Sequence, residues 1–323
     1  MKIIALFKSG FSKLLANLKI ILIIYIVNIT LTILIAVPLY VSLRNDTAKR
    51  EVRETLTSGF DYEWWNEFSF QAKGIEKTFI PSLESGFGPL LENFELILSG
   101  DFSRLGTLLF LLALVYMIIN SFFAGGAIAI YADEKRKYSI SRFFSNSAVF
   151  FNRYFSLTLT LLLLFILFFK VIHPAIFLFI KGITYNTISE RLVFFLNFLG
   201  YLVFFILILF VNMVFDYAKV IVVVENRESA WQAIWWALKF VLKHFSKVMR
   251  LYYFLGLVAI GLAFTLALIQ SVYNTSSVIV LVIAVIVQQA SIFLKIGMRL
   301  LFYTAQLDMY LYGKSLVRRQ PKA

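Results

Sequence analysis

Six long apolar runs, separated by polar and charged segments, dominate the chain. A helix needs about 20 apolar residues to cross the roughly 30 Å hydrocarbon core of a bilayer, and each run comes close to that length or exceeds it. The pattern predicts an all-α polytopic membrane protein with six transmembrane helices, at about residues 20–43, 105–132, 155–173, 192–215, 251–271 and 277–299. We expect one membrane domain over residues 1–323.

A second pattern precedes three of these spans, where apolar residues recur at helical spacing among polar ones. The segments Ser139–Phe155 and Ser229–Phe245 align without a gap, with Phe150 falling on Phe240. The N-terminal segment joins more loosely, through Phe7, Phe11, Leu14 and Leu18. Each segment is predicted to be a basic amphipathic helix in the membrane interface. The sequence thus predicts three like-oriented repeats, each an interfacial helix followed by a helical hairpin.

Charge is distributed unevenly between the segments that join the spans. Segments 1–19, 133–154, 225–250 and 312–323 together hold 18 of the 31 Lys and Arg residues. The long segment 44–104 holds 7 basic and 11 acidic residues. Because basic residues gather on the cytoplasmic side, we expect a multi-pass protein of the cell inner membrane with cytoplasmic N- and C-termini. Amphipathic helices at 133–154 and 225–250 would then be cytoplasmic, and 44–104 an extracytoplasmic insertion.

The composition agrees with a membrane protein and excludes several kinds of site. Hydrophobic residues make up 60% of the 323 residues and charged ones 15%, against about 25% charged in soluble domains. The net charge of +13 could indicate nucleic-acid binding, but the charges flank apolar runs, which favours lipid headgroups. With no cysteine and two histidines, thiolate sites and polyhistidine metal sites are excluded. We predict no cofactor, no metal and no nucleic-acid partner.

The insertion contains two short amphipathic patterns, over Asp61–Gln71 and Leu90–Leu98. Aromatic side chains gather in the first pattern: Trp64, Trp65, Phe68 and Phe70. Because aromatics favour the headgroup level of a membrane, we interpret the insertion as a cap lying on the outer surface. A lid over a substrate path is the alternative.

Five charged residues near the predicted inner ends of the fourth and sixth spans form the candidate site. Charged side chains at membrane depth are costly and often functional. Asp216 is placed to pair with Lys295 or Arg299, which are four apart and share a helix face. Lys219 is placed to pair with Asp308. Two hypotheses remain open, a structural ion-pair network and a cytoplasm-facing pocket for an anionic headgroup or ion, where Arg299 suits phosphate.

Two local features also allow a structural and a functional interpretation. His173 precedes Pro174, so we expect the third span to break or kink there, although a proton-relay role for His173 is the alternative. Trp231 and Trp235 are four apart on a predicted amphipathic helix. They are typical of an interfacial anchor, with an aromatic ligand cage as the alternative.

Known catalytic motifs are absent from the sequence. It contains no GxSxG, HExxH, P-loop or GxGxxG pattern, so we predict that the protein is not an enzyme and has no catalytic residues. Neutral amides do lie inside the predicted spans, at Asn120, Asn197, Asn212, Gln288 and Gln289. They could line the polar path of a transporter or channel, or form interhelical hydrogen bonds.

One stretch resembles a known group of proteins. Phe215–Phe245 reads FDYAKVIVVVENRESAWQAIWWALKFVLKHF, a return span followed by a short charged turn and an amphipathic helix with an early serine. This arrangement resembles bacterial six-span inner-membrane families of the YciC-like kind, and the membrane domain fused to some glycerophosphodiester phosphodiesterases. The resemblance covers Phe122–Gly313 and implies an integral inner-membrane protein without assigned catalysis. The insertion has no counterpart in that group, and no phosphodiesterase domain is present.

Taken together, these patterns favour a non-enzymatic membrane protein that binds or organises anionic lipid or scaffolds a membrane-protein partner. The repeated basic amphipathic helix carries this hypothesis, because such helices contact anionic headgroups. A transporter or channel with a polar path through the helix bundle is the alternative.

Overall fold

The computed structural model describes residues 3–49, 61–73, 76–77, 79, 107–133, 138–271 and 278–319. Within these ranges the chain forms helices and short connections, and no strand occurs. Six helical segments are long and apolar enough to cross a membrane: Leu18–Ala48, Leu111–Ala132, Ile140–Thr184, Glu190–Val224, Phe245–Gln270 and Val282–Ser315. The prediction of an all-α multi-pass membrane protein with six such helices is confirmed. The pattern over Leu90–Leu98 lies outside the described residues.

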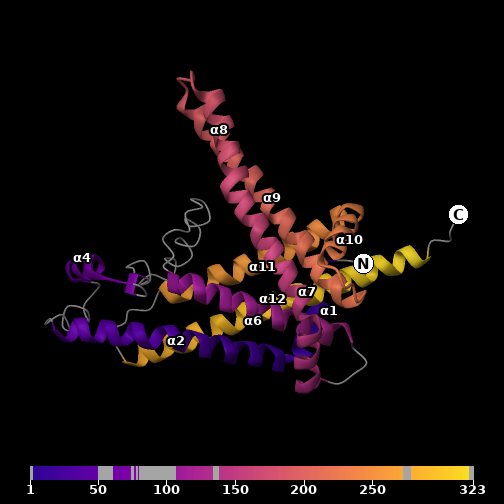
Figure 1. The fold of residues 1–323 in the computed structure, drawn as a ribbon, viewed down its shortest axis with the longest axis horizontal. Coiled ribbons are helices and arrows are strands. Elements are labelled where there is room, and N and C mark those ends of the chain that lie inside the picture. The colour runs from indigo at the N-terminus through magenta and orange to yellow at the C-terminus, as the bar shows by residue number, and fades with distance from the viewer. Residues whose placement is uncertain are drawn as a thin grey trace. The chain divides into compact units, whose positions relative to one another are not determined.

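The helices follow one another along the chain as shown in Figure 1. They are α1 (Ile3–Ala16), α2 (Leu18–Lys49), α4 (Tyr62–Gln71), α6 (Thr107–Ala132), α7 (Ile140–Leu167), the π-helical η4 (Phe168–Ile172), α8 (His173–Thr184), α9 (Glu190–Val224), α10 (Ala230–Lys243), α11 (Phe245–Ser271) and α12 (Val278–Arg319). The chain divides into two compact units. The first comprises Met1–Lys13, Met117–Tyr253 and Phe302–Ala323, and the second comprises Leu14–Tyr116 and Phe254–Leu301.

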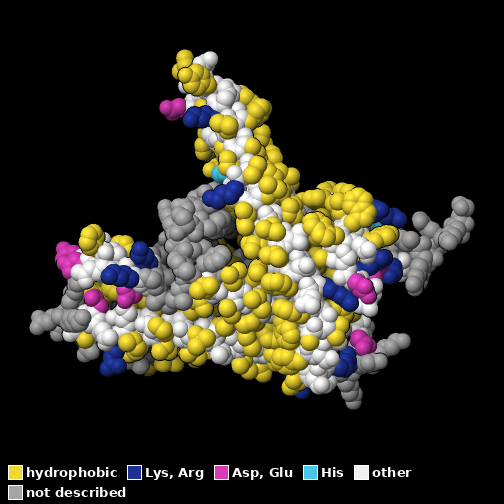
Figure 2. All heavy atoms as spheres, in the orientation of Figure 1, with side chains coloured by type: hydrophobic (Ala, Val, Ile, Leu, Met, Phe, Trp, Pro, Cys, Tyr) yellow, Lys and Arg dark blue, Asp and Glu magenta, His cyan; other side chains and the backbone are white. Residues whose placement is uncertain are grey.

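In the first unit, the helical segment α7–η4–α8 pairs with α9 over most of its length (Figure 1). The Tyr154 hydroxyl donates to the Lys219 carbonyl at 2.7 Å. Where α8 meets α9, Gly200 lies very close to Ile180. A Cβ added to Gly200 would be 2.6 Å from the Cδ1 atom of Ile180. The outward face of the pair seen in Figure 2 is mostly hydrophobic. Large apolar side chains on the outside and close backbone contact within are typical of helices that face lipid.

The third candidate span differs from its sequence-based description. We expected a cytoplasmic amphipathic helix over 133–154, a span over 155–173, and a break or kink at His173. Instead the chain is helical from Ile140 to Thr184, and one π-helical turn, Phe168–Ile172, precedes Pro174. A π-helical turn accommodates the backbone distortion that a proline introduces, since proline has no N–H and crowds the preceding turn. The helix therefore continues through the proline rather than ending there.

In the second unit, the start of the insertion folds onto the end of α2. Asp61 caps α4, its side chain accepting from the Trp64 backbone N–H, and the Trp64 indole N–H donates to Asp46 at 2.8 Å. Trp64, Phe68 and Ala72 are buried together, with Leu43, Trp65 and Phe79 packed against them. Trp64 and Phe68 therefore form a small protein core within the predicted cap. Phe70 is 91% exposed and remains available to lipid.

Candidate functional site

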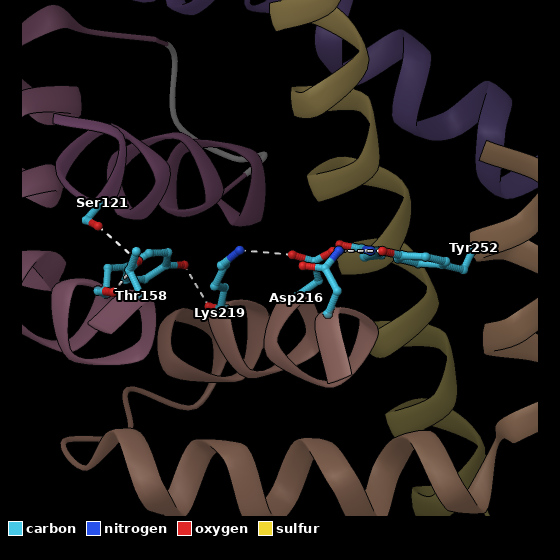
Figure 3. A network of polar contacts seen from close by, with 8 residues as sticks. Ser121, Thr158, Asp216, Lys219 and Tyr252 are labelled. Atoms are coloured by element: carbon cyan, nitrogen blue, oxygen red, sulfur yellow. Dashed lines mark hydrogen bonds and ion pairs between the residues drawn. The ribbon is translucent and has the colours of Figure 1, made fainter. Parts of the chain in front are cut away.

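The central polar cluster of the first unit is an ion pair on α9. Lys219 donates to Asp216 at 2.9 Å, and both side chains are 13% exposed. The amide of Gln306, from α12, also donates to Asp216 at 3.4 Å. Figure 3 shows these contacts continuing from Lys219 toward Thr158 and Ser121 of the neighbouring helices. The ion pair itself lies within α9, and the hydrogen bonds from Gln306 of α12 and Tyr154 of α7 make the cluster a crosslink between helices.

The second cluster joins the two ends of the chain. Asp308 of α12 accepts from the Lys13 ammonium and, at 2.7 Å, from the Ser9 hydroxyl. Its side chain is 9% exposed, and that of Lys13 is 14% exposed. A carboxylate so nearly enclosed needs both donors, since an unpaired buried charge is strongly destabilising. The contact fixes α1 against the end of α12.

The five residues of the predicted site are thus divided between different settings. Asp216 and Lys219 pair with each other, and Asp308 pairs with Lys13. Lys295 and Arg299 are exposed side chains of α12 in the second unit. The sequence could not indicate Lys13 as a partner, because 295 residues separate it from Asp308.

Sequence reasoning missed a third cluster, centred on Glu225 just after α9. This carboxylate accepts from the Tyr310 hydroxyl at 2.6 Å, from Lys314 at 3.1 Å and from Arg227 at 3.0 and 3.1 Å. Partial burial by itself raises the pKa of Glu225, but the hydrogen bonds from Tyr310, Lys314 and Arg227 outweigh it and hold the pKa below the ordinary value. The sequence feature that could have indicated this cluster is the acidic Glu225 at the start of the basic segment 225–250.

Replacing Glu225 with glutamine is expected to lower the free energy of unfolding by about 1.5–3 kcal/mol at neutral pH, the range for hydrogen bonds to a charged group. A lowered pKa means that this stabilisation is complete above the ordinary value of 4.5 and is lost as the pH falls through the lowered pKa. Unfolding of wild type and Glu225→Gln in mixed micelles should therefore differ at pH 7 and converge in acid. A difference that grows on acidification would contradict this assignment.

The exposed side of α10 combines tryptophan with basic residues. Its buried face consists of small residues four apart, Ala233, Ala237 and Val241. Because these pack against α9, the large aromatic side chains turn outward, and Trp231 is 71% exposed. The Lys239 ammonium lies 4.9 Å from the ring centroid of Trp235 and 5.3 Å from that of Trp236, and Arg227 lies 5.3 Å from the Trp236 ring. The basic groups are thereby held at the same surface as the indoles.

Within the ranges that the structure describes, no group of three or more His, Asp or Glu side chains could hold a metal ion. No protein-family model, curated protein or solved structure matches the chain.

Proposed function

We propose that the protein is a non-enzymatic inner-membrane protein that binds anionic phospholipid through the outward face of α10. The observation that carries this proposal is the exposed layer of three tryptophans with Lys239 and Arg227 stacked on them. Indoles prefer the headgroup level of a bilayer, and each Lys or Arg near an anionic surface contributes about 1 kcal/mol of attraction. The face therefore has the chemistry of an anionic headgroup site.

Further basic residues continue along the same stretch of chain. Lys239 and Lys243 of α10 are exposed, as are Lys247 and Arg250 of α11, and no acidic residue lies between them. If this stretch faces the cytoplasm, as the charge distribution favours, it meets the leaflet in which anionic lipids give the surface its negative potential. Both chain termini are then cytoplasmic.

Helix boundaries support the proposal of three like-oriented repeats. α7 begins at Ile140 and α10 at Ala230, and these positions coincide in the alignment read from the sequence. α1 ends at Ala16 and α10 at Lys243, which also coincide. Two of the three helices thus start in register and two end in register, whereas α7 continues to Leu167 as part of its span.

Packing gives independent support for the repeat. Each interfacial helix buries a small residue at the same position of the alignment. These residues are Gly10 of α1, Ser147 of α7 and Ala237 of α10. An added Cβ on Gly10 would lie 2.8 Å from the Thr304 hydroxyl of α12, and one on Gly126 of α6 would lie 2.0 Å from the Ser147 hydroxyl. Each interfacial helix therefore packs on the helix that closes a hairpin, namely α1 on α12, α7 on α6 and α10 on α9.

Neutralising the α10 face should release anionic lipid. With about 1 kcal/mol for each lysine, Lys239→Gln plus Lys243→Gln is expected to weaken retention of phosphatidylglycerol roughly thirtyfold. Native mass spectrometry of protein extracted in its own membrane patch measures this retention. The matched control is Lys181→Gln plus Arg191→Gln, which removes two exposed basic residues from the α8–α9 end of the first unit.

A second variant separates the two possible headgroup sites. Lys295→Ala plus Arg299→Ala removes the exposed basic pair of α12. Loss of lipid in this variant alone would place the site on α12 and overturn the assignment to α10. Equal retention in all variants would leave scaffolding or transport as the better function.

A transporter or channel is the second candidate, and a polar stripe on α2 favours it. The Tyr25 hydroxyl donates to the Gln289 amide of α12 at 3.0 Å, and Asn28 and Thr32 follow on the same side of α2. Transport requires a water-filled path past these side chains. A cysteine introduced at position 28 would be labelled by a membrane-impermeant maleimide if such a path exists, and the natural sequence contains no cysteine to interfere.

A further inference from the structure

The second unit contains a cavity, open at the surface, between α2, α6 and α12. Its volume is about 440 Å³, within the range of roughly 300–1,000 Å³ that is usual for small-molecule sites. Most of the described lining is apolar, including Leu31, Leu112 and Ile292. Its polar members are Asn28, Thr32 and Tyr116.

The cavity lies near the middle of the α2 span. Asn28 is ten residues beyond Leu18, where α2 begins, which corresponds to about 15 Å along a helix. The hydrocarbon core is about 30 Å thick, so with Leu18 at one surface of the core Asn28 lies close to its centre. A phospholipid keeps its charged headgroup at the interface and can present only methylene groups at this depth.

Two hydrogen-bond donors in the cavity have no partner among the residues that the structure describes. The Thr32 hydroxyl donates to the Asn28 backbone carbonyl at 2.9 Å. Neither the Asn28 amide nor the Tyr116 hydroxyl hydrogen-bonds to another residue in the described part of the chain. An unpaired donor surrounded by hydrocarbon is costly. A molecule that fills the cavity therefore needs an acceptor that can reach the centre of the bilayer.

We propose that this cavity binds an uncharged lipid whose compact head carries a carbonyl oxygen, the chemistry of an isoprenoid quinone. The carbonyl accepts from Asn28 and Tyr116, and the apolar tail lies along Leu31, Leu112 and Ile292. A free carboxylate or phosphate is excluded by depth, because an ionised group at the centre of the bilayer has no cation among the described lining residues. This inference does not depend on the headgroup site of α10.

Photoaffinity labelling in lipid nanodiscs tests the proposal. The probe is an azido derivative of decylbenzoquinone, and the labelled peptides are identified by mass spectrometry. We expect labelling concentrated on the α2 and α6 segments that line the cavity. Unlabelled decylbenzoquinone should compete, whereas decylbenzene, with the same tail and no carbonyl, should compete at least tenfold more weakly.

Two substitutions act on different parts of the site. Ala113→Trp fills the cavity and should abolish the concentrated labelling. Asn28→Leu removes one donor and should weaken competition by decylbenzoquinone roughly threefold, the value of one hydrogen bond within a membrane. The matched control is Asn197→Leu, whose amide donates to the Val193 carbonyl within α9 and lies outside the cavity.

Three results would overturn the proposal. One is labelling spread evenly over all six spans in wild type and Ala113→Trp alike. Another is equal competition by decylbenzene, which would reduce the site to an acyl-chain groove. The third is rapid labelling of Asn28→Cys by a membrane-impermeant maleimide, which would mean that the cavity holds water and would favour transport.

Discussion

Replacing Asp216 with leucine is expected to lower the free energy of unfolding by about 3–5 kcal/mol, the cost of leaving one member of a buried ion pair unpaired. Both Asp216 and Lys219 are 13% exposed, so water cannot fully solvate the lysine that remains. The Gln306 amide also loses its acceptor. Unfolding by SDS titration in mixed micelles measures the change.

The double variant Asp216→Leu plus Lys219→Met distinguishes a crosslink from a functional charge. Replacing both members of a buried pair by apolar residues is often neutral or stabilising, so most of the lost stability should return. Lys295→Met provides the control, because its side chain is exposed and its removal should change stability by less than about 0.5 kcal/mol. If Asp216→Leu lowers the free energy of unfolding no more than Lys295→Met does, the ion pair is solvated and the helix crosslink is absent.

Local patterns explain which parts of the fold could be predicted. The six apolar runs correspond to helices because the length and hydropathy of a span are properties of its own sequence. The same is true of α4, whose cap residue Asp61 and apolar positions are adjacent in the chain. Amphipathic periodicity likewise predicted α10.

The partners of the charged residues could not be predicted in the same way. Charge spacing identified Asp308 as a residue needing a cation, but Lys13 becomes its neighbour only when α1 packs against α12. For Asp216 the lysine three residues along its own helix is near in any helical arrangement, so this pair follows from local spacing, whereas the predicted partners Lys295 and Arg299 make no hydrogen bond or ion pair with it among the described residues. The burial of Trp64 depends on Leu43 and Phe79, from separate segments, which the local aromatic pattern of residues 61–71 does not reveal.

The tight crossing of α6 and α7 leads to the second large expected effect. Gly126→Ala should destabilise the protein by more than the roughly 1–3 kcal/mol usual for overpacking. The added Cβ would lie 2.0 Å from the Ser147 hydroxyl oxygen and 2.7 Å from the Phe143 carbonyl oxygen. A serine side chain can rotate away, but the carbonyl belongs to the backbone of α7, so the two helices must move apart.

Two glycines elsewhere in the chain give a graded control series. Gly10→Ala meets the Thr304 hydroxyl at 2.8 Å and the Ala305 nitrogen at 3.1 Å, and should cost less. Gly256→Ala meets nothing within 4 Å and should stabilise α11 by about 0.5–1 kcal/mol through helix propensity alone. Adding Ser147→Gly to Gly126→Ala removes only the first clash and should restore only part of the stability. Equal unfolding free energies for the three alanine variants would mean that α6 and α7 do not cross at backbone contact, and would remove the packing argument for the repeat.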